Sequence, residues 1–464
     1  MEFIEYSLIV RIYMYSSGGI SLSKKRTCIL WYSTLFTIVI GAVFVLVAFS
    51  EVKKAVLHFE KNSQPEWSAV EQYPFTENEK ESDFQGVQNL NNSSALPRIL
   101  ASIDKAQLFL KTGATSEFCF QMPFVTLSKA TDKYCWGYSL TTSLHSTKRV
   151  ENAGDCVIES DNGMLYLPLP KESIDDNIEV VVRYAEKEKQ EGKNFIFLEI
   201  PINAYGEDRL LLYPDYYEDY SSTMTDHLIT SLEEAGVDVI SMSKEFYDEG
   251  LNSEDIFLRT DHHWLPQSAM RACFSLADKL NKNYGYSVDT QLFDISNYDI
   301  SYAPNNAFGS LGKKVTRVYA EPERLPILTP KYDSDVTVFI SKTNETRTGK
   351  IQEVLFNWDA LRSKDIYERE WGFYGFDDQA LVSIHNNLKQ DGKRVLVLRN
   401  SFADAMTPYL GNLAENVDII YLAYFDGSLE TFIKETAPDT IVLAYTVRFF
   451  QYDVGEKGVN FNFK

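Results

Sequence analysis

Two short stretches of this chain contain residue types that together can activate a hydroxyl group. Residues 259–264 read Arg-Thr-Asp-His-His-Trp and place Asp261 and His263 two positions apart. Residues 399–403 read Arg-Asn-Ser-Phe-Ala and contain Ser401. A serine hydroxyl is a weak nucleophile at neutral pH and needs an adjacent base, which needs a group that holds its tautomer. We therefore expect Ser401 to be the nucleophile, His263 the base and Asp261 the orienting acid of one active site.

The spacing within the first stretch favours a loop that leads into a helix. Residues i and i+2 of an extended segment point the same way, so Asp261 and His263 would share a face and His262 would point away. Pro266 suits the first position of a helix, which indicates that the helix begins only after Trp264.

Ser401 follows an apolar run, residues 395–398, that is typical of a buried parallel strand. The carboxyl ends of parallel strands are where α/β folds bind ligands. Backbone N–H groups that open the next helix could bind an oxyanion. An alternative is that Ser401 only caps that helix, with Asp404 completing a capping box. Our candidate oxyanion or supporting residues are Asn203, Asn400, His262 and Trp264.

Composition excludes some functions. The 464 residues include 66 acids against 45 Lys and Arg, so the net charge is −21, which disfavours nucleic acid as a partner. The five cysteines lack the spacing of a zinc site, and we expect neither a metal nor another cofactor. The Asp-His-His run nevertheless keeps a metal-dependent phosphoesterase open as an alternative function.

The N-terminal part predicts a membrane anchor. Residues 28–49 are 22 residues without a charge, long enough to span a bilayer as a helix. Basic residues before them favour a cytoplasmic tail at 1–27. Residues 50–100 are polar and acidic and predict a juxtamembrane linker. We therefore expect a single-pass protein of the cell membrane whose main domain is extracytoplasmic.

Residues 101–448 predict an α/β domain, and 449–464 a C-terminal tail. From residue 173 onward, apolar stripes at helical spacing alternate with short apolar runs, the pattern of a parallel sheet flanked by helices. Residues 286–380 interrupt this rhythm and predict a β-rich insertion, with strands expected at 315–319, 336–340 and 352–356. The α/β pattern returns at 381–448.

The two motifs, Thr-Asp-His-His-Trp at 260–264 and Asn-Ser-Phe at 400–402, resemble those of the DHHW family. That family groups with SGNH-hydrolase-like proteins of the alginate O-acetyltransferase type (AlgX/AlgJ-like). The resemblance covers roughly residues 150–448 and implies an SGNH-like (flavodoxin-like) fold. It assigns Asp261, His263 and Ser401 the acid, base and nucleophile roles. The chain departs from these relatives at Asn400, where they carry an aspartate, and at 421–424, where they carry Asp-x-Arg-Tyr.

The resemblance implies acyl transfer, usually of acetyl groups, to or from an extracellular polysaccharide. We therefore expect a membrane-anchored serine O-acetyltransferase or carbohydrate esterase that acts on a cell-envelope or exopolysaccharide glycan. Its expected partners are that cell-surface polysaccharide and a membrane-bound O-acyltransferase as acyl donor. An alternative is a catalytically impaired protein of the same fold that binds glycan or serves in assembly.

Overall fold

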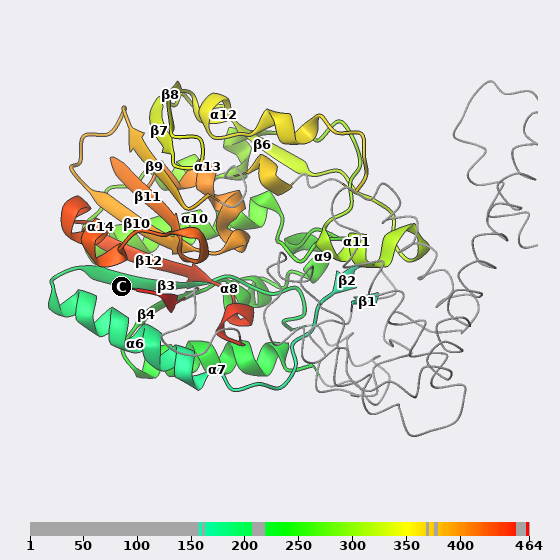
Figure 1. Ribbon diagram of the computed structural model, residues 1–464, viewed down its shortest axis with the longest axis horizontal. Coiled ribbons are helices and arrows are strands. Elements are labelled where there is room, and N and C mark those ends of the chain that lie inside the picture. The colour runs from blue at the N-terminus through cyan, green and yellow to red at the C-terminus, as the bar shows by residue number, and fades with distance from the viewer. Residues whose placement is uncertain are drawn as a thin grey trace, which may run out of the picture. The chain divides into compact units, whose positions relative to one another are not determined.

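The computed structural model describes residues 157–159, 163–206, 219–367, 371–374, 379–451 and 461–463 (Figure 1). All of them belong to one of the two units of the chain, Phe118–Lys464. The tail, anchor and linker expected at 1–27, 28–49 and 50–100 lie outside the described residues. Within the described ranges, no helix combines the length and the apolar character that a bilayer crossing requires.

An eight-stranded sheet forms the centre of the described unit (Figure 1). Its first five strands are parallel, as the apolar runs predict. Residues 395–398 are completely buried because helices cover both faces at this point. In spatial order the strands are β4 (Asp238–Ser241), β3 (Asn194–Glu199), β12 (Thr440–Tyr445), β10 (Arg394–Arg399), β11 (Asn416–Tyr421), β9 (Leu381–Asn386), β7 (Val336–Ile340) and β8 (Glu345–Gly349).

The sheet is mixed, and the prediction of a parallel sheet was wrong for its last three strands. β9 pairs antiparallel with β11, β7 with β9, and β8 with β7. β7 alternates buried Val336, Val338 and Ile340 with more exposed residues, the pattern of a strand with one solvated face. Part of the predicted insertion therefore extends the main sheet and does not form a separate subdomain.

Helices form a layer on each face of the sheet. α10 (Pro266–Tyr284) packs over Ile196 and Val397, whereas α6 (Asp175–Gln190), α7 (Ser221–Glu234) and α14 (Leu429–Thr436) pack over Phe197 and Leu396. Neighbouring residues of one strand thus enter opposite cores, as the period of two requires. Pro266 begins α10 as predicted, and Gly285 ends it with a φ of 66°.

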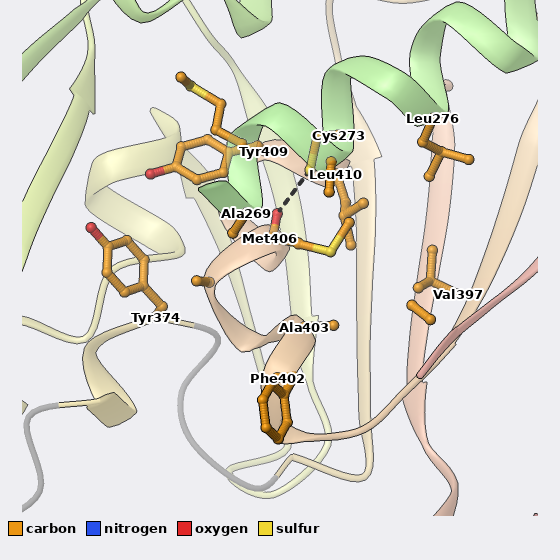
Figure 2. Packing of buried hydrophobic residues seen from close by; sticks show 14 of the residues in the cluster. Ala269, Cys273, Leu276, Tyr374, Val397, Phe402, Ala403, Met406, Tyr409 and Leu410 are labelled. Carbon is orange, nitrogen blue, oxygen red and sulfur yellow. Dashed lines mark hydrogen bonds between the residues drawn. The ribbon is translucent and has the colours of Figure 1, made fainter. Parts of the chain in front are cut away.

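The segment after β10 is tied to α10. It begins with the 3-10 helix η10 (Ser401–Met406) and continues as α13 (Thr407–Leu410). Figure 2 shows Met406 and Leu410 of this segment against Ala269 and Cys273 of α10. The buried Cys273 thiol lies 3.9 Å from the Met406 carbonyl oxygen. This packing fixes the position of the segment that follows β10 relative to the edge of the sheet.

The predicted insertion contains fewer strands than expected. The structure confirms a strand at 336–340, but 315–319 and 352–356 are mainly helical. Leu311 and Val315 are buried at helical spacing, and Glu353 accepts a hydrogen bond from the Lys350 backbone at 3.1 Å, which caps the second helix. Packing and capping thus override the β propensity of these runs.

The other elements are small. A hairpin of β1 (Ile158–Glu159) and β2 (Leu165–Tyr166) precedes α6, and β5 (Tyr298–Tyr302) pairs with β6 (Pro326–Pro330) outside the main sheet. The remaining helices are α8 (Met242–Asp248), α9 (Ser253–Ile256), η5 (Thr290–Phe293), η6 (Ile295–Asn297), α11 (Ser310–Val315), η7 (Thr316–Val318), α12 (Ile351–Val354), η8 (Trp358–Leu361), η9 (Trp371–Phe373), η11 (Leu422–Tyr424) and η12 (Val447–Gln451).

Glu199, at the end of β3, makes the stability of the fold depend on pH. It is fully buried and accepts hydrogen bonds from the Ser243 hydroxyl and backbone at 2.7 and 2.9 Å. Burial outweighs these bonds and raises its pKa to about 7. Because this pKa exceeds the unfolded value, the folded chain binds more protons between the two values. The free energy of unfolding should therefore fall by about 3 kcal/mol as the pH rises through that window.

We expect the Glu199→Gln variant to lose this contribution to the pH dependence. Urea denaturation at pH 5 and pH 8 measures the difference in unfolding free energy for each protein. Wild type should lose stability relative to the variant as the pH rises. Identical changes in the two proteins would show that Glu199 does not titrate in this range.

Candidate active site

The Asp-His-His motif lies on a bent loop between α9 and α10, as its spacing predicts. The Leu258 backbone N–H donates to the His263 carbonyl at 3.1 Å, and Phe257 bridges to Trp264, so the loop closes on itself. The Trp264 indole is fully buried and donates from Nε1 to the Phe402 carbonyl at 2.7 Å. This bond joins the motif loop directly to the turn that carries Ser401.

Ser401 is the first residue of η10 and is not its cap. The Asn400 side chain caps the turn by accepting a hydrogen bond from the Phe402 backbone at 3.0 Å. The alternative in which Ser401 serves only as a helix cap is therefore wrong. The Ser401 hydroxyl instead contacts the motif loop at the carboxyl end of β10.

The structure brings Asp261, His263 and Ser401 into one hydrogen-bonded series. His263 Nδ1 lies 2.6 Å from Asp261 Oδ1, and His263 Nε2 lies 3.1 Å from Ser401 Oγ. Asp261 and His263 are buried, whereas Ser401 is half-buried. An ionised carboxylate can only accept, so Nδ1 carries the proton and Nε2 is left to accept from the serine hydroxyl. This is the arrangement that general-base activation of a serine requires.

The Asp261 carboxylate has further partners on both oxygens. The His263 backbone N–H donates to Oδ1 at 2.9 Å, and the Ser310 backbone N–H donates to Oδ2 at 2.6 Å. Burial alone would raise the pKa of Asp261, but the neighbouring His263, through its ring and its backbone N–H, holds that pKa well below its usual range. Asp261 therefore stays ionised and can stabilise a charged His263.

Residue 309 has to be a glycine because its backbone approaches the motif loop closely. A Cβ atom there would overlap the Asp261 side chain and lie 2.6 Å from the Thr260 carbonyl oxygen. We expect Gly309→Ala to displace the Asp261 carboxylate and lower kcat for a small acetyl ester about 100-fold, because small misplacements of an orienting group are costly. Steady-state kinetics with a parallel thermal melt would test this. An unchanged kcat in a folded variant would contradict it.

His262 does not point away from the site, so that part of the prediction was wrong. Its ring lies 4.0 Å from the His263 ring and 5.1 Å from the Phe402 ring, and its Nδ1 contacts the Ser310 hydroxyl. The loop bends between these residues, so the alternation of an extended segment does not apply. Burial, which disfavours the charged form, is the main reason that the pKa of His262 lies well below its usual range. His262 is therefore a neutral imidazole beside the base.

Asn203 is engaged elsewhere. Its Nδ2 donates to the Leu165 carbonyl at 2.9 Å, and its Oδ1 accepts from the Leu167 backbone at 3.4 Å. Among the described residues, no hydrogen bond joins its side chain to Ser401 or His263. Asn203 thus braces the segment after β2, and its oxyanion role stays a prediction.

Sequence reasoning missed Glu323, a half-buried acid in the predicted insertion. Its carboxylate anchors the motif loop. Its Oε1 accepts from the Thr260 backbone and hydroxyl at 2.6 and 2.7 Å, and its Oε2 accepts from the Arg259 backbone at 3.0 Å. It lies 63 residues from Thr260 along the chain. No local pattern marks such a residue, because its role arises only from the fold.

A fully buried ion pair, also missed, secures the turn that carries Ser401. Arg399 Nη1 lies 2.5 Å from Asp404 Oδ1, and the guanidinium stacks 4.9 Å from the Tyr421 ring centroid. The pair joins the end of β10 to η10. Removing one partner would leave an unpaired buried charge and should be strongly destabilising, so the pair holds the turn in place.

Asp261, His262 and His263 could also hold a metal ion, since a ligand atom from each lies within 4.8 Å of the others. Two nitrogens and one oxygen form a donor set that zinc accepts in catalytic sites. However, Asp261 Oδ1 and His263 Nδ1 are already hydrogen-bonded to each other. A metal would have to replace that bond, so the residues fit a triad better than a metal centre.

Two family models match parts of this chain. Residues 163–303 match the family model of the SGNH hydrolase-like domain of acetyltransferase AlgX. Residues 244–421 match the family model of the DHHW protein. The resemblance to DHHW and AlgX-type proteins is thus confirmed. Together with the site geometry, the matches support SGNH-type O-acetyltransferase or esterase activity.

Solved structures resemble the fold at low sequence identity. Bacillus cereus PatB1, solved with a sulfonyl adduct, is 18% identical with a TM-score of 0.53, over 66% of this chain and 99% of that one. A DHHW family protein from Eubacterium siraeum is 17% identical with a TM-score of 0.49, over 68% and 97%. No match was found among the curated proteins.

Proposed function

We propose that this protein is a serine O-acyltransferase or esterase that transfers or removes acetyl groups on a cell-envelope glycan. The observation that carries the proposal is the hydrogen-bonded series from the Asp261 carboxylate through the His263 imidazole to the Ser401 hydroxyl, with steps of 2.6 and 3.1 Å. The match of residues 163–303 to the domain of acetyltransferase AlgX supports the choice of acetyl as the acyl group.

The reaction follows from the geometry. His263 Nε2 takes the Ser401 proton as Oγ attacks the carbonyl carbon of an acetyl ester, which gives a tetrahedral oxyanion. The Ser401 backbone N–H at the start of η10 is the oxyanion donor we propose. The protonated His263 then gives its proton to the leaving alcohol, and an acetyl-serine forms. A sugar hydroxyl or water, deprotonated by His263, releases the acetyl group and restores the serine.

The location and partners belong to the same proposal. The uncharged run at 28–49 supports a membrane anchor with the catalytic unit outside the cytoplasm. A membrane-bound O-acyltransferase would then supply the acetyl group, and a surface polysaccharide would accept it.

Trapping with a fluorophosphonate tests the proposed nucleophile. The reagent phosphonylates only a serine whose hydroxyl is activated, so peptide mass spectrometry should find the label on Ser401 and lose it in His263→Ala. No label on a folded protein would favour the alternative of an impaired, glycan-binding member of this fold. An acetyl ester offered with an oligosaccharide would separate the remaining cases, because transfer yields an acetylated sugar and hydrolysis yields acetate.

A metal-dependent phosphoesterase is the second candidate, favoured by the clustered ligands of Asp261, His262 and His263. It predicts phosphate ester hydrolysis that a chelator abolishes and zinc restores. The serine mechanism predicts acetyl ester turnover that a chelator leaves unchanged.

A further inference from the structure

The proposed reaction uses Asp261 and His263 but not His262, which lies between them in the sequence. The His262 ring is 4.0 Å from the His263 ring and 5.1 Å from the Phe402 ring. Phe402 directly follows Ser401. The His262 side chain is 25% exposed, whereas that of His263 is 4% exposed. A second imidazole at the triad is thus the more accessible of the two.

Ser310 holds one nitrogen of the His262 ring. Its hydroxyl contacts His262 Nδ1, and its backbone N–H donates to Asp261 Oδ2 at 2.6 Å. The same Nδ1 lies 3.6 Å from Asp261 Oδ1. The residue that orients the acid of the triad therefore also fixes the ring beside the base.

The other nitrogen of this ring, Nε2, is open to a ligand. It has no hydrogen-bond partner within the part of the chain that the structure describes. It is also not one of the buried side-chain atoms that lack a partner, so solvent reaches it. A bound substrate can therefore take the place of water at His262 Nε2.

The chemistry of the ring favours a hydroxyl as its partner. Burial holds the pKa of His262 well below its usual range, so the ring stays neutral. A neutral imidazole has one donor and one acceptor nitrogen and carries no charge to attract a carboxylate or phosphate group. A hydroxyl both donates and accepts, so it suits Nε2 in either tautomer.

The place of the ring beside the base indicates which hydroxyl this is. In the proposed reaction, His263 exchanges a proton with the alcohol oxygen that carries or receives the acetyl group. The two imidazoles are neighbours, with ring centroids 4.0 Å apart. A substrate with one oxygen at His263 therefore brings its next oxygen to His262. On a sugar, that oxygen belongs to the hydroxyl on the adjacent carbon.

We propose that His262 is a specificity-determining residue whose Nε2 binds the hydroxyl next to the alcohol oxygen that carries or receives the acetyl group. Ser310 is the positioning residue that holds the ring for this contact. The inference rests on the proposed function, because it concerns the alcohol side of that reaction. The same contact serves transfer and hydrolysis, since the alcohol leaves and enters through the same arrangement.

Two esters that differ by one hydroxyl test this contact. The monoacetate of trans-1,2-cyclohexanediol has a hydroxyl beside its ester oxygen, and cyclohexyl acetate lacks it. In the wild type we expect kcat/KM to be about tenfold higher for the monoacetate. The ratio of the two kcat/KM values should fall about tenfold in His262→Phe, which keeps a ring beside His263 but has no ring nitrogen. His262→Gln, whose amide can reach the place of Nε2, should keep the ratio within about threefold of the wild-type value.

The ratio separates a contact with substrate from support of the base. A displaced base would slow both esters by the same factor and leave the ratio unchanged. Ser310→Ala keeps the backbone donor to Asp261 but releases the His262 ring, so the ratio should fall at least about threefold. On the surface, His227 Nδ1 lies 3.4 Å from Ser231 Oγ, which is a matched pair. His227→Phe and Ser231→Ala should leave both rates as in the wild type.

Equal ratios in the wild type and in folded His262→Phe would overturn the inference, as would a wild-type ratio near one. If thermal melts show that His262→Phe is unfolded, the Ser310→Ala ratio decides in its place. Full turnover in Ser401→Ala, or no turnover of either ester by the wild type, would remove the proposed function and the inference with it. Turnover that depends on Ser401 with an unaltered ratio would remove the inference alone.

Discussion

Replacing Ser401 with alanine should lower turnover of a small acetyl ester at least about 10⁴-fold, and His263→Ala should lower it by a similar factor. The serine oxygen forms the acyl bond, and His263 Nε2, 3.1 Å away, is positioned to take its proton. Because the two groups act as a unit, the double variant should lose little more than either single variant. Initial rates with p-nitrophenyl acetate, corrected for uncatalysed hydrolysis, measure each loss.

The chain offers a matched control on its surface. His227 Nε2 lies 2.7 Å from Asp175 Oδ1, and its Nδ1 lies 3.4 Å from Ser231 Oγ, so the same three residue types meet there. The His227 and Asp175 side chains are 51% and 64% exposed, however, and water competes for every bond. Ser231→Ala and His227→Ala should leave turnover unchanged. Full activity in a folded Ser401→Ala protein would rule out the serine mechanism.

Asp261→Asn should lower kcat about 10⁴-fold while changing KM little. The amide keeps the volume of the acid and can still accept from the Ser310 backbone. It no longer offers a carboxylate to His263 Nδ1, which lies 2.6 Å away in the wild type. The imidazole then loses both its tautomer preference and the negative charge that stabilises its protonated form.

Asp175→Asn is the control for this variant, since it removes the carboxylate beside His227 on the surface. It should leave kcat as in the wild type. Thermal melts of both variants separate a catalytic loss from unfolding. A kcat for Asp261→Asn within a factor of a few of the wild-type value would show that the carboxylate does not orient the base.

Local pattern was enough to predict the parallel strands of the central sheet and several helices beside them, but not β8 and β9. α6, β3 and α10 follow from apolar spacing, and Pro266 and Gly285 mark where α10 begins and ends. Buried parallel strands are continuous apolar runs, so β10 was recognisable without its neighbours. The helical conformation of the runs at 315–319 and 352–356 was not recognisable from the sequence. Their burial against other segments, and not their β propensity, decides their conformation.

Residue types and spacing determined which groups of this protein could form a serine site and that the acid and base lie on a loop before a helix. Only the tertiary structure decided that the sheet is mixed, because the antiparallel pairing of β9 with β11 depends on how the chain folds back to the sheet. It also decided that Asn400 caps the turn and that Gly309 and Glu323 hold the motif loop. These contacts join residues remote in sequence, and a pattern of neighbours carries no information about partners that only folding brings together.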